Sequence, residues 1–274
     1  MPSDWSWSEV DIVVPGRPGL SGVAMAGFRR RAVTSSDITM VAHPSVTLLV
    51  DLSEGEGAGY DSHGRYERGS VVVGLAPGQL RATGRARVEC LQIRLEPAVA
   101  ATVLGASADL SGAMTPLGDV WGRDAGRVED RLRAAASWEE RFAIAARILA
   151  ERLDGRPAVD PEVVQAWRRT LESRGRLRVE GLADEIGWSR KRLWSRFRSQ
   201  LGISPKRAAR LVRFDHAAHL LAAGRAAAGV AAACGYADQS HLHRETAAFA
   251  GLTPTAVAGA PWLAIDDVAW PATS

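Results

Sequence analysis

The sequence has little of what marks a secreted, membrane-spanning or metal-dependent protein. Its 274 residues include only two cysteines, Cys90 and Cys234, which lie far apart in the chain. They form neither a metal-binding spacing nor a disulfide framework, so we expect two reduced packing residues. No run of about 18 apolar residues occurs, and we therefore expect no transmembrane helix and no membrane partner.

The N-terminus also lacks the basic and apolar stretches of a signal peptide. Asp4, Glu9 and Asp11 stand where such a peptide would carry positive charge and then an apolar run. We therefore expect a cytoplasmic protein. An apolar content of 46% is ordinary for a globular chain, and the length favours two domains, each large enough for its own core.

Positive charge is concentrated in the last part of the chain. Residues 157–259 contain 16 Lys and Arg against 9 Asp and Glu, whereas residues 1–156 contain 18 against 20. A basic domain attached to a nearly neutral one is typical of proteins that meet a polyanion, such as nucleic acid.

Within this basic part, residues 180–205 show a helix, a glycine turn and a second helix. Leu182, Ala183 and Ile186 lie at helical spacing and form one apolar face. Gly187 is suited to ending that helix, because glycine enters the left-handed C-cap conformation without steric cost. Ser189 is placed to cap the next helix through its hydroxyl.

The second helix of this pair combines a buried stripe with a cationic outer face. Leu193 and Phe197 are four residues apart and are expected to point inward. The basic residues around them are Arg190, Lys191, Arg192, Arg196 and Arg198. Such a helix is suited to the major groove of DNA, and the whole stretch is a helix-turn-helix pattern.

This stretch resembles the first helix-turn-helix of AraC/XylS-type transcription regulators. The matching residues are Leu182-Ala183, Ile186-Gly187-Trp188-Ser189, Leu193, Phe197 and Gly202-Ile203-Ser204-Pro205. A second copy follows about fifty residues later, as in that family, and includes Val230, Gly235, Leu242, Phe249, Gly251 and Pro254. The resemblance covers residues 158–259. It implies a bacterial-type transcription regulator that binds double-stranded DNA, contacts RNA polymerase and has no enzyme activity.

We therefore expect an α+β protein of two domains. Residues 1–155 would form a sensor or dimerisation domain, β-rich over 10–96 and helical over 97–153, and residues 158–259 the DNA-binding domain. The resemblance implies a cupin-like β-barrel that binds a small-molecule effector, forms a homodimer, or both. The pattern predicts strands at 11–14, 22–26, 45–50, 70–75 and 87–95, and helices at 97–104, 123–135, 137–153, 161–171, 205–223 and 226–234. Residues 260–274 would form a tail over a domain surface.

The two recognition helices are expected at about 189–200 and 238–250, entering successive major grooves. Their outward residues, expected to read bases, are Arg190, Lys191, Trp194, Ser195 and Arg198, with Gln239, Ser240, His241 and Arg244 in the second copy; the resemblance itself points to Lys191, Trp194 and Ser195. Expected phosphate contacts are Arg178, Arg196, Arg207, Arg210 and Arg213. The core of the two units would contain Leu182, Ile186, Leu193, Phe197, Leu242 and Phe249.

One departure from the family pattern is Thr246, where a phenylalanine is usual. It weakens the inward stripe of the second recognition helix, so we predict that this unit is less stable and contributes less to specificity.

The N-terminal part offers fewer signals. His43 and His63 are isolated, so the metal-binding pattern of cupins is absent and we expect no metal or cofactor. Trp5, Trp7 and Tyr60 could line a pocket, but core packing is the favoured interpretation. Arg29, Arg30 and Arg31 are expected on an exposed strand or turn.

Two other functions are weighed against transcription regulation. One is a DNA-repair enzyme that transfers an alkyl group to an activated thiolate in a basic pocket; neither Cys90 nor Cys234 has such a setting in the sequence. The other is an effector-binding protein whose DNA contacts have decayed, for which Thr246 is the support.

Overall fold

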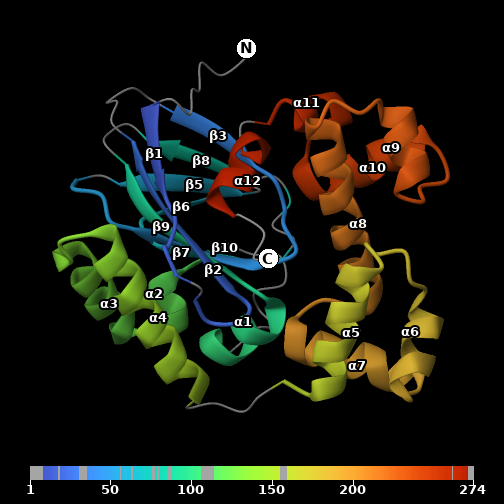
Figure 1. The fold of residues 1–274 in the computed structure, drawn as a ribbon, viewed down its shortest axis with the longest axis horizontal. Coiled ribbons are helices and arrows are strands. Elements are labelled where there is room, and N and C mark those ends of the chain that lie inside the picture. The colour runs from blue at the N-terminus through green and yellow to red at the C-terminus, as the bar shows by residue number, and fades with distance from the viewer. Residues whose placement is uncertain are drawn as a thin grey trace.

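The protein, described from a computed structural model, has a β-rich N-terminal domain followed by a helical region (Figure 1). The structure describes residues 9–17, 19–30, 36–55, 57–62, 64–75, 78, 80–84, 88–105, 114–154, 159–260 and 262–270. Trp5, Trp7, Arg31, His63, the expected domain boundary at 155–158 and the last four residues of the tail lie outside these ranges.

The β-rich domain consists of two antiparallel sheets. The six-stranded sheet has the order β1 (Val10–Val13), β2 (Val23–Arg30), β9 (Glu89–Leu95), β4 (Val46–Asp51), β7 (Val71–Val73) and β10 (Met114–Pro116). The four-stranded sheet has the order β3 (Ser36–Met40), β8 (Leu80–Gly84), β5 (Ala58–Ser62) and β6 (Arg65–Arg68). The expected β-rich N-terminal domain is confirmed, but none of the strands of the four-stranded sheet is among those that the sequence pattern predicts.

The reason lies in the composition of the second sheet. The strand β5 reads Ala-Gly-Tyr-Asp-Ser and β6 reads Arg-Tyr-Glu-Arg, without the apolar alternation that predicts a strand. These strands form by pairing with neighbours, Tyr60 lying opposite Ala82 and Glu67, rather than by their own propensity.

Helices cover one face of the six-stranded sheet. They are α1 (Pro97–Leu104), α2 (Leu117–Trp121), α3 (Arg123–Ala134) and α4 (Trp138–Asp154). Leu48 and Leu91 from the sheet are fully buried in the same apolar cluster as Leu149 of α4. Gly27 of β2 lies directly under the ring of Trp138, where a Cβ atom would come within 2.4 Å of the ring, so the glycine is needed for this close packing.

The helical region follows the predicted order. It contains α5 (Pro161–Glu172), α6 (Val179–Ile186), α7 (Arg190–Leu201), α8 (Pro205–Ala222), α9 (Ala227–Ala233), α10 (Gln239–Ala250) and α11 (Pro254–Ala258). The long helix α8 joins the group α5–α7 to the group α9–α11 (Figure 1). Among the described helices, no single one is long and apolar enough to cross a membrane, and one bent pair, Gln239–Ala250 with Pro254–Ala269, passes by length and composition alone.

After α11 the chain turns back to the β-rich domain. The 3-10 helix η3 (Leu263–Ile265) and the short helix α12 (Asp266–Ala269) lie over its strands (Figure 1). Asp266 of α12 also contacts Nε2 of His219 on α8 at 2.8 Å. Trp262, Ile265 and Ala269 are buried there.

Candidate nucleic-acid interface

Helix α7 is held by capping at both ends and by a buried stripe. The hydroxyl of Ser189 accepts a hydrogen bond from the backbone N–H of Arg192 at 3.2 Å, which satisfies one of the free donors at the helix start. Gly187, with φ of 73°, ends the preceding helix α6, and Gly202, with φ of 77°, ends α7; both adopt the left-handed conformation. Leu193 and Phe197 are fully buried, and the Phe197 ring packs against Trp167 of α5.

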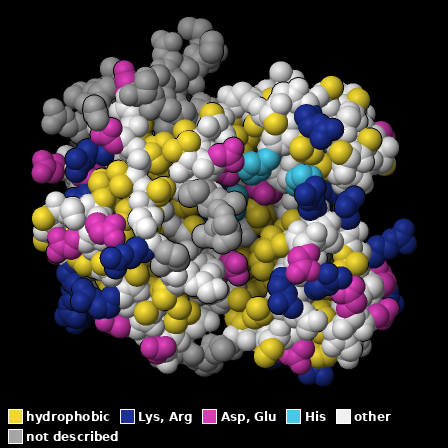
Figure 2. All heavy atoms as spheres, in the orientation of Figure 1, with side chains coloured by type: hydrophobic (Ala, Val, Ile, Leu, Met, Phe, Trp, Pro, Cys, Tyr) yellow, Lys and Arg dark blue, Asp and Glu magenta, His cyan; other side chains and the backbone are white. Residues whose placement is uncertain are grey.

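The opposite face of α7 is open to solvent. Exposed side chains from this face are Arg190, Lys191, Arg192, Trp194, Ser195 and Arg198. Trp194 is 47% exposed, which is unusual for so large an apolar side chain, and the guanidinium of Arg198 lies 5.2 Å from its ring centroid. Arg190 makes only an exposed ion pair with Glu180 at 3.4 Å. Figure 2 shows cationic side chains over this lower group of helices.

Helix α10 is the corresponding helix of the second unit. The carboxylate of Asp238 caps it by accepting the N–H of His241 at 2.6 Å. Gln239, Ser240 and Arg244 are exposed on its outer side. His241 is half-buried: its ring meets Tyr236 edge-on at 5.2 Å and its Nδ1 lies 3.4 Å from the N–H of Ala237, which it can accept.

Thr246 is fully buried on the inner side of α10. Its hydroxyl donates to the carbonyl of Leu242 at 2.8 Å, so the polar group is satisfied within the helix. The aromatic contact comes from Phe249, which stacks on Phe214 of α8 at 5.3 Å. The stripe is thus shorter than the family pattern but is anchored by Leu242, which is also fully buried.

A buried acid joins α10 to α8. The side chain of Glu245 is 1% exposed and binds Arg210 at 2.8 Å and Arg213 at 2.9 Å. Arg213 also lies over the ring of Tyr236. The sequence reasoning missed Glu245, although its spacing of three from Leu242 and four from Phe249 places it on the inward face.

The arginines expected to contact phosphates therefore differ in their exposure and in whether a carboxylate already pairs with them. Arg196 makes a two-pronged pair with Asp160, both bonds at 2.7 Å, and these hydrogen bonds lower the pKa of the Asp160 carboxyl. Arg210 and Arg213 are paired with Glu245, with exposed side-chain fractions of 42% and 18%. Arg178 and Arg207 are exposed at the starts of α6 and α8.

A cationic cleft lies between the two units. It has a volume of about 840 Å³, and its basic lining residues are Arg176, Arg178, Lys206, Arg210, Arg213 and Arg244. Gly175, with φ of 69°, brings the turn before α6 against α8; a Cβ atom there would come within 2.0 Å of the Ala209 carbonyl oxygen. The cleft continues the positive surface from the first unit to the second.

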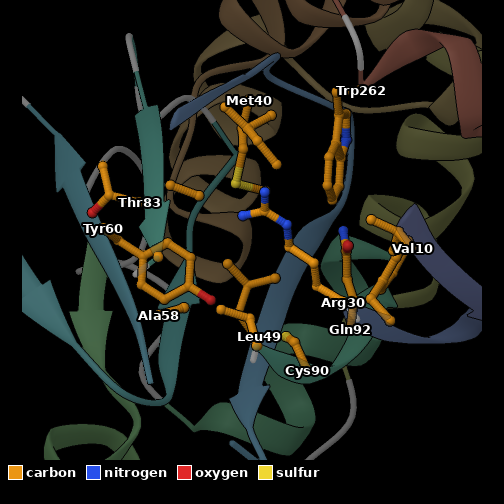
Figure 3. A pocket seen from close by; sticks show the side chains of 15 residues that line it. Val10, Arg30, Met40, Leu49, Ala58, Tyr60, Thr83, Cys90, Gln92 and Trp262 are labelled. Atoms are coloured by element: carbon orange, nitrogen blue, oxygen red, sulfur yellow. The ribbon is translucent and has the colours of Figure 1, made fainter. Parts of the chain in front are cut away.

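A second hollow lies between the two sheets of the β-rich domain. This sensor cavity has a volume of about 90 Å³ and apolar walls that include Phe28, Met40 and Tyr60 (Figure 3). The interpretation of Tyr60 as plain core packing was incomplete, because its buried ring also lines the cavity. The expectation of an exposed Arg30 was wrong: β2 turns it inward, it is 7% exposed and it lines the cavity, whereas Arg29 pairs with Glu89 outside.

The cysteines and histidines show no catalytic or metal arrangement in the described part of the chain. Burial raises the pKa of the Cys90 thiol to about 12, with a further contribution from Asp51, and burial also raises the pKa of Cys234. Neither thiol is therefore an activated nucleophile. No group of three or more His, Cys, Asp or Glu side chains among the described residues could hold a metal ion.

Comparison with known proteins locates the similarity in the C-terminal part. Residues 182–259 match a family model described as a helix-turn-helix domain. No curated protein matches the chain significantly. Among solved structures, ToxT from Vibrio cholerae O395, bound to (E)-4-(8-methylnaphthalen-1-yl)but-3-enoic acid, is 10% identical over 87% of this chain and 99% of its own, with a TM-score of 0.49.

Two further structures are similar over smaller parts. The C-terminal domain of AraT, a response regulator from Geobacillus stearothermophilus, is 23% identical over 37% of this chain and 86% of its own, with a TM-score of 0.35. The AraC-like transcriptional activator CuxR is 16% identical over 69% of this chain and 80% of its own, with a TM-score of 0.33.

Proposed function

Residues 182–259 form a helix-turn-helix domain of the AraC type, and from this premise we propose that the chain is a sequence-specific transcription regulator whose helices α7 and α10 enter successive major grooves of DNA. The observation that supports it most is α7 itself. Leu193 and Phe197 anchor the helix from behind, while its basic and aromatic residues stay exposed.

Base reading is assigned to the exposed residues near the start of each helix. Lys191 can donate to guanine O6 and N7, Ser195 can serve either kind of base, and Trp194 can contact a thymine methyl group. Arg190 and Arg198 flank these three on α7. On α10 the corresponding set is Gln239, Ser240, His241 and Arg244, in which Gln239 suits adenine and the half-buried His241 is restrained by Tyr236.

Phosphate contacts are assigned by exposure. Arg178 and Arg207 are exposed, and Arg196 and Arg210 keep about half of their side chains accessible beside their acidic partners. Arg213 is mostly covered, so its main contribution is to hold Glu245. The two recognition helices would then address groove segments about one helical turn, roughly 34 Å, apart.

The N-terminal part, residues 1–155, is proposed as a sensor and dimerisation domain that controls the DNA-binding domain at 158–259. The sensor cavity between the sheets supplies a place for a small-molecule effector. A homodimer and a contact with RNA polymerase complete the proposal. The number and spacing of half-sites in bound DNA test the first, and transcription in vitro with purified polymerase tests the second.

Selection of bound duplexes from a random library, at a fixed near-physiological salt concentration, tests the central proposal. We expect an enriched site that contains two recognition segments. Lys191→Ala should relax the preference at one position and cost about 1–3 kcal/mol of discrimination there. Arg131→Ala removes one exposed positive charge from α3 and serves as the control. A library that shows no enrichment would refute sequence-specific binding.

The smaller contribution of the second unit is tested with the same duplex. Arg244→Ala should reduce affinity less than Lys191→Ala. The opposite order would show that α10 is the dominant reader.

A further inference from the structure

The cationic cleft lies between the two helix-turn-helix units and belongs to neither recognition helix alone. Its lining residues come from the turn between α5 and α6, the start of α6, the first half of α8 and one face of α10. Helix α8 joins the two units along this line (Figure 1). The lining that the structure describes includes no Phe, Tyr or Trp, so the cleft offers no aromatic wall to an apolar small molecule.

The charge of the cleft is strongly positive. Six Lys and Arg side chains line it, against the two acids Glu180 and Glu245. Glu245 is already bound by Arg210 and Arg213 at 2.8 and 2.9 Å, and Glu180 forms an exposed pair with Arg190 at 3.4 Å. The remaining cations are therefore not neutralised from within the cleft, which suits it to a polyanion.

Arg176 connects the two units across the cleft. It is exposed, and its Nε lies 3.4 Å from the carbonyl oxygen of Ser173. Gly235 is the left-handed residue after α9, in the second unit; a Cβ atom there would lie 3.8 Å from Cδ of Arg176. The Arg176 side chain thus extends from the first unit to the turn of the second. Among the described residues, no carboxylate pairs with it.

Lys206 is the second cation to which the sequence pattern assigned no role. It is exposed near the start of α8, and no described carboxylate pairs with it either. The close packing of Gly175 against the Ala209 carbonyl fixes the turn that carries Arg176 relative to α8. The two cations are therefore held in the same cleft by backbone packing and not by flexible loops alone.

The expected path of DNA brings phosphates to this place. Two recognition helices in successive major-groove segments on one face of a duplex leave a minor-groove segment between them. The sugar-phosphate backbones of both strands border that segment and face the protein between the two units. The cleft lies between the unit that contains α7 and the unit that contains α10.

We infer that the cationic cleft holds the phosphate backbone that borders this central minor groove, with Arg176 and Lys206 as its positioning residues. Contacts of this kind fix where both recognition helices lie on the duplex but carry no sequence information. The inference rests on the proposed function, because the path of the DNA requires α7 and α10 in successive major grooves.

The first experiment measures the affinity of the full chain for one selected duplex between about 50 and 200 mM salt. Each lost phosphate contact reduces the log–log slope by roughly 0.9, so the affinity ratio across this range should fall by about 3.5-fold. We expect this result for Arg176→Gln and for Lys206→Gln. The conservative variants Arg176→Lys and Lys206→Arg keep the charge and should keep the slope.

Arg131→Gln is the matched control, because it removes an exposed positive charge from α3 in the β-rich domain. Its slope should equal that of the unchanged chain. An unchanged slope in both Arg176→Gln and Lys206→Gln would overturn the inference. So would a loss of affinity that depends on whether the central segment is A·T-rich or G·C-rich, because that would place the two side chains in the minor groove as readers.

The second experiment neutralises phosphates of the duplex instead of side chains. Methylphosphonate groups in the central segment should weaken binding of the unchanged chain at least threefold. The same groups outside the footprint should have no effect. The double variant Arg176→Gln with Lys206→Gln should bind the neutralised and the ordinary duplex about equally, because both changes remove the same contacts. A full loss that persists in the double variant would assign those phosphates to other residues and overturn the inference.

The two proposals can fail separately. An enriched site in the random library, with unchanged salt slopes in both glutamine variants, would refute this inference and leave the proposed function intact. Duplex binding without sequence preference, in which both variants still reduce the slope, would refute sequence-specific regulation and leave the cleft as a phosphate-binding site.

Discussion

Replacement of Glu245 by glutamine should lower the stability of the helical region. It should also make DNA affinity more sensitive to the salt concentration. Glu245 is 1% exposed, and its two oxygens bind Arg210 at 2.8 Å and Arg213 at 2.9 Å. A hydrogen bond to a charged group contributes about 1.5–3 kcal/mol. The two guanidiniums are 42% and 18% exposed and regain water, and glutamine keeps one acceptor. We therefore expect Glu245→Gln to lower the free energy of unfolding by about 2–3 kcal/mol, below the range for a fully buried pair.

Urea denaturation of the full chain, followed by circular dichroism, measures this loss. Asp184→Asn removes a negative charge from an exposed position of α6 and should change stability by about 0.5 kcal/mol or less. DNA affinity measured across a salt series provides a second readout. If the freed Arg210 and Arg213 meet phosphates, each should steepen the log–log slope by roughly 0.9.

An unchanged free energy of unfolding in Glu245→Gln would refute the view that this carboxylate fastens α10 to α8. A clear loss of stability with an unchanged slope of log DNA affinity against log salt concentration would support that view. It would also show that Arg210 and Arg213 do not contact phosphates.

Two further changes test other parts of the structure. Gly27→Ala forces a methyl group against the ring of Trp138 and should lower the free energy of unfolding by about 1–3 kcal/mol. Thermal denaturation measures this loss. Gly16→Ala is the control, because a Cβ atom there meets open space. The hydrogen bond to Asp266 raises the pKa of His219 from 6.5 to about 9, with further support from Asp215. The stabilisation is therefore complete below about pH 6.5 and lost as the pH rises through about 9. Because the His219 side chain is 35% exposed and solvent screens the pair, the expected fall in the free energy of unfolding is about 1–2 kcal/mol. Asp266→Asn should flatten that fall.

The recognition helices could be predicted because their signals are local. A serine or aspartate cap, a left-handed glycine and a leucine–phenylalanine stripe act within four residues of one another. The first helix-turn-helix therefore follows from residues 180–205, and the structure gives Ser189 and Gly187 the conformations that the pattern requires. The exposed face of α7 follows as well, because a helix that buries one stripe presents the other to solvent.

Tertiary contacts determined the features that depend on residues far apart in the sequence. The strand β5 exists because β8 and β6 pair with it, and Arg30 is buried because the register of β2 turns it inward. Glu245 became a structural anchor only when α8 placed Arg210 and Arg213 beside it. In the two helix-turn-helix units, the sequence alone determined where the recognition helices begin, where they end and which of their faces are apolar, since those preferences are local. Only the folded chain could bring Trp262 to the sensor cavity, because that contact links segments more than 150 residues apart.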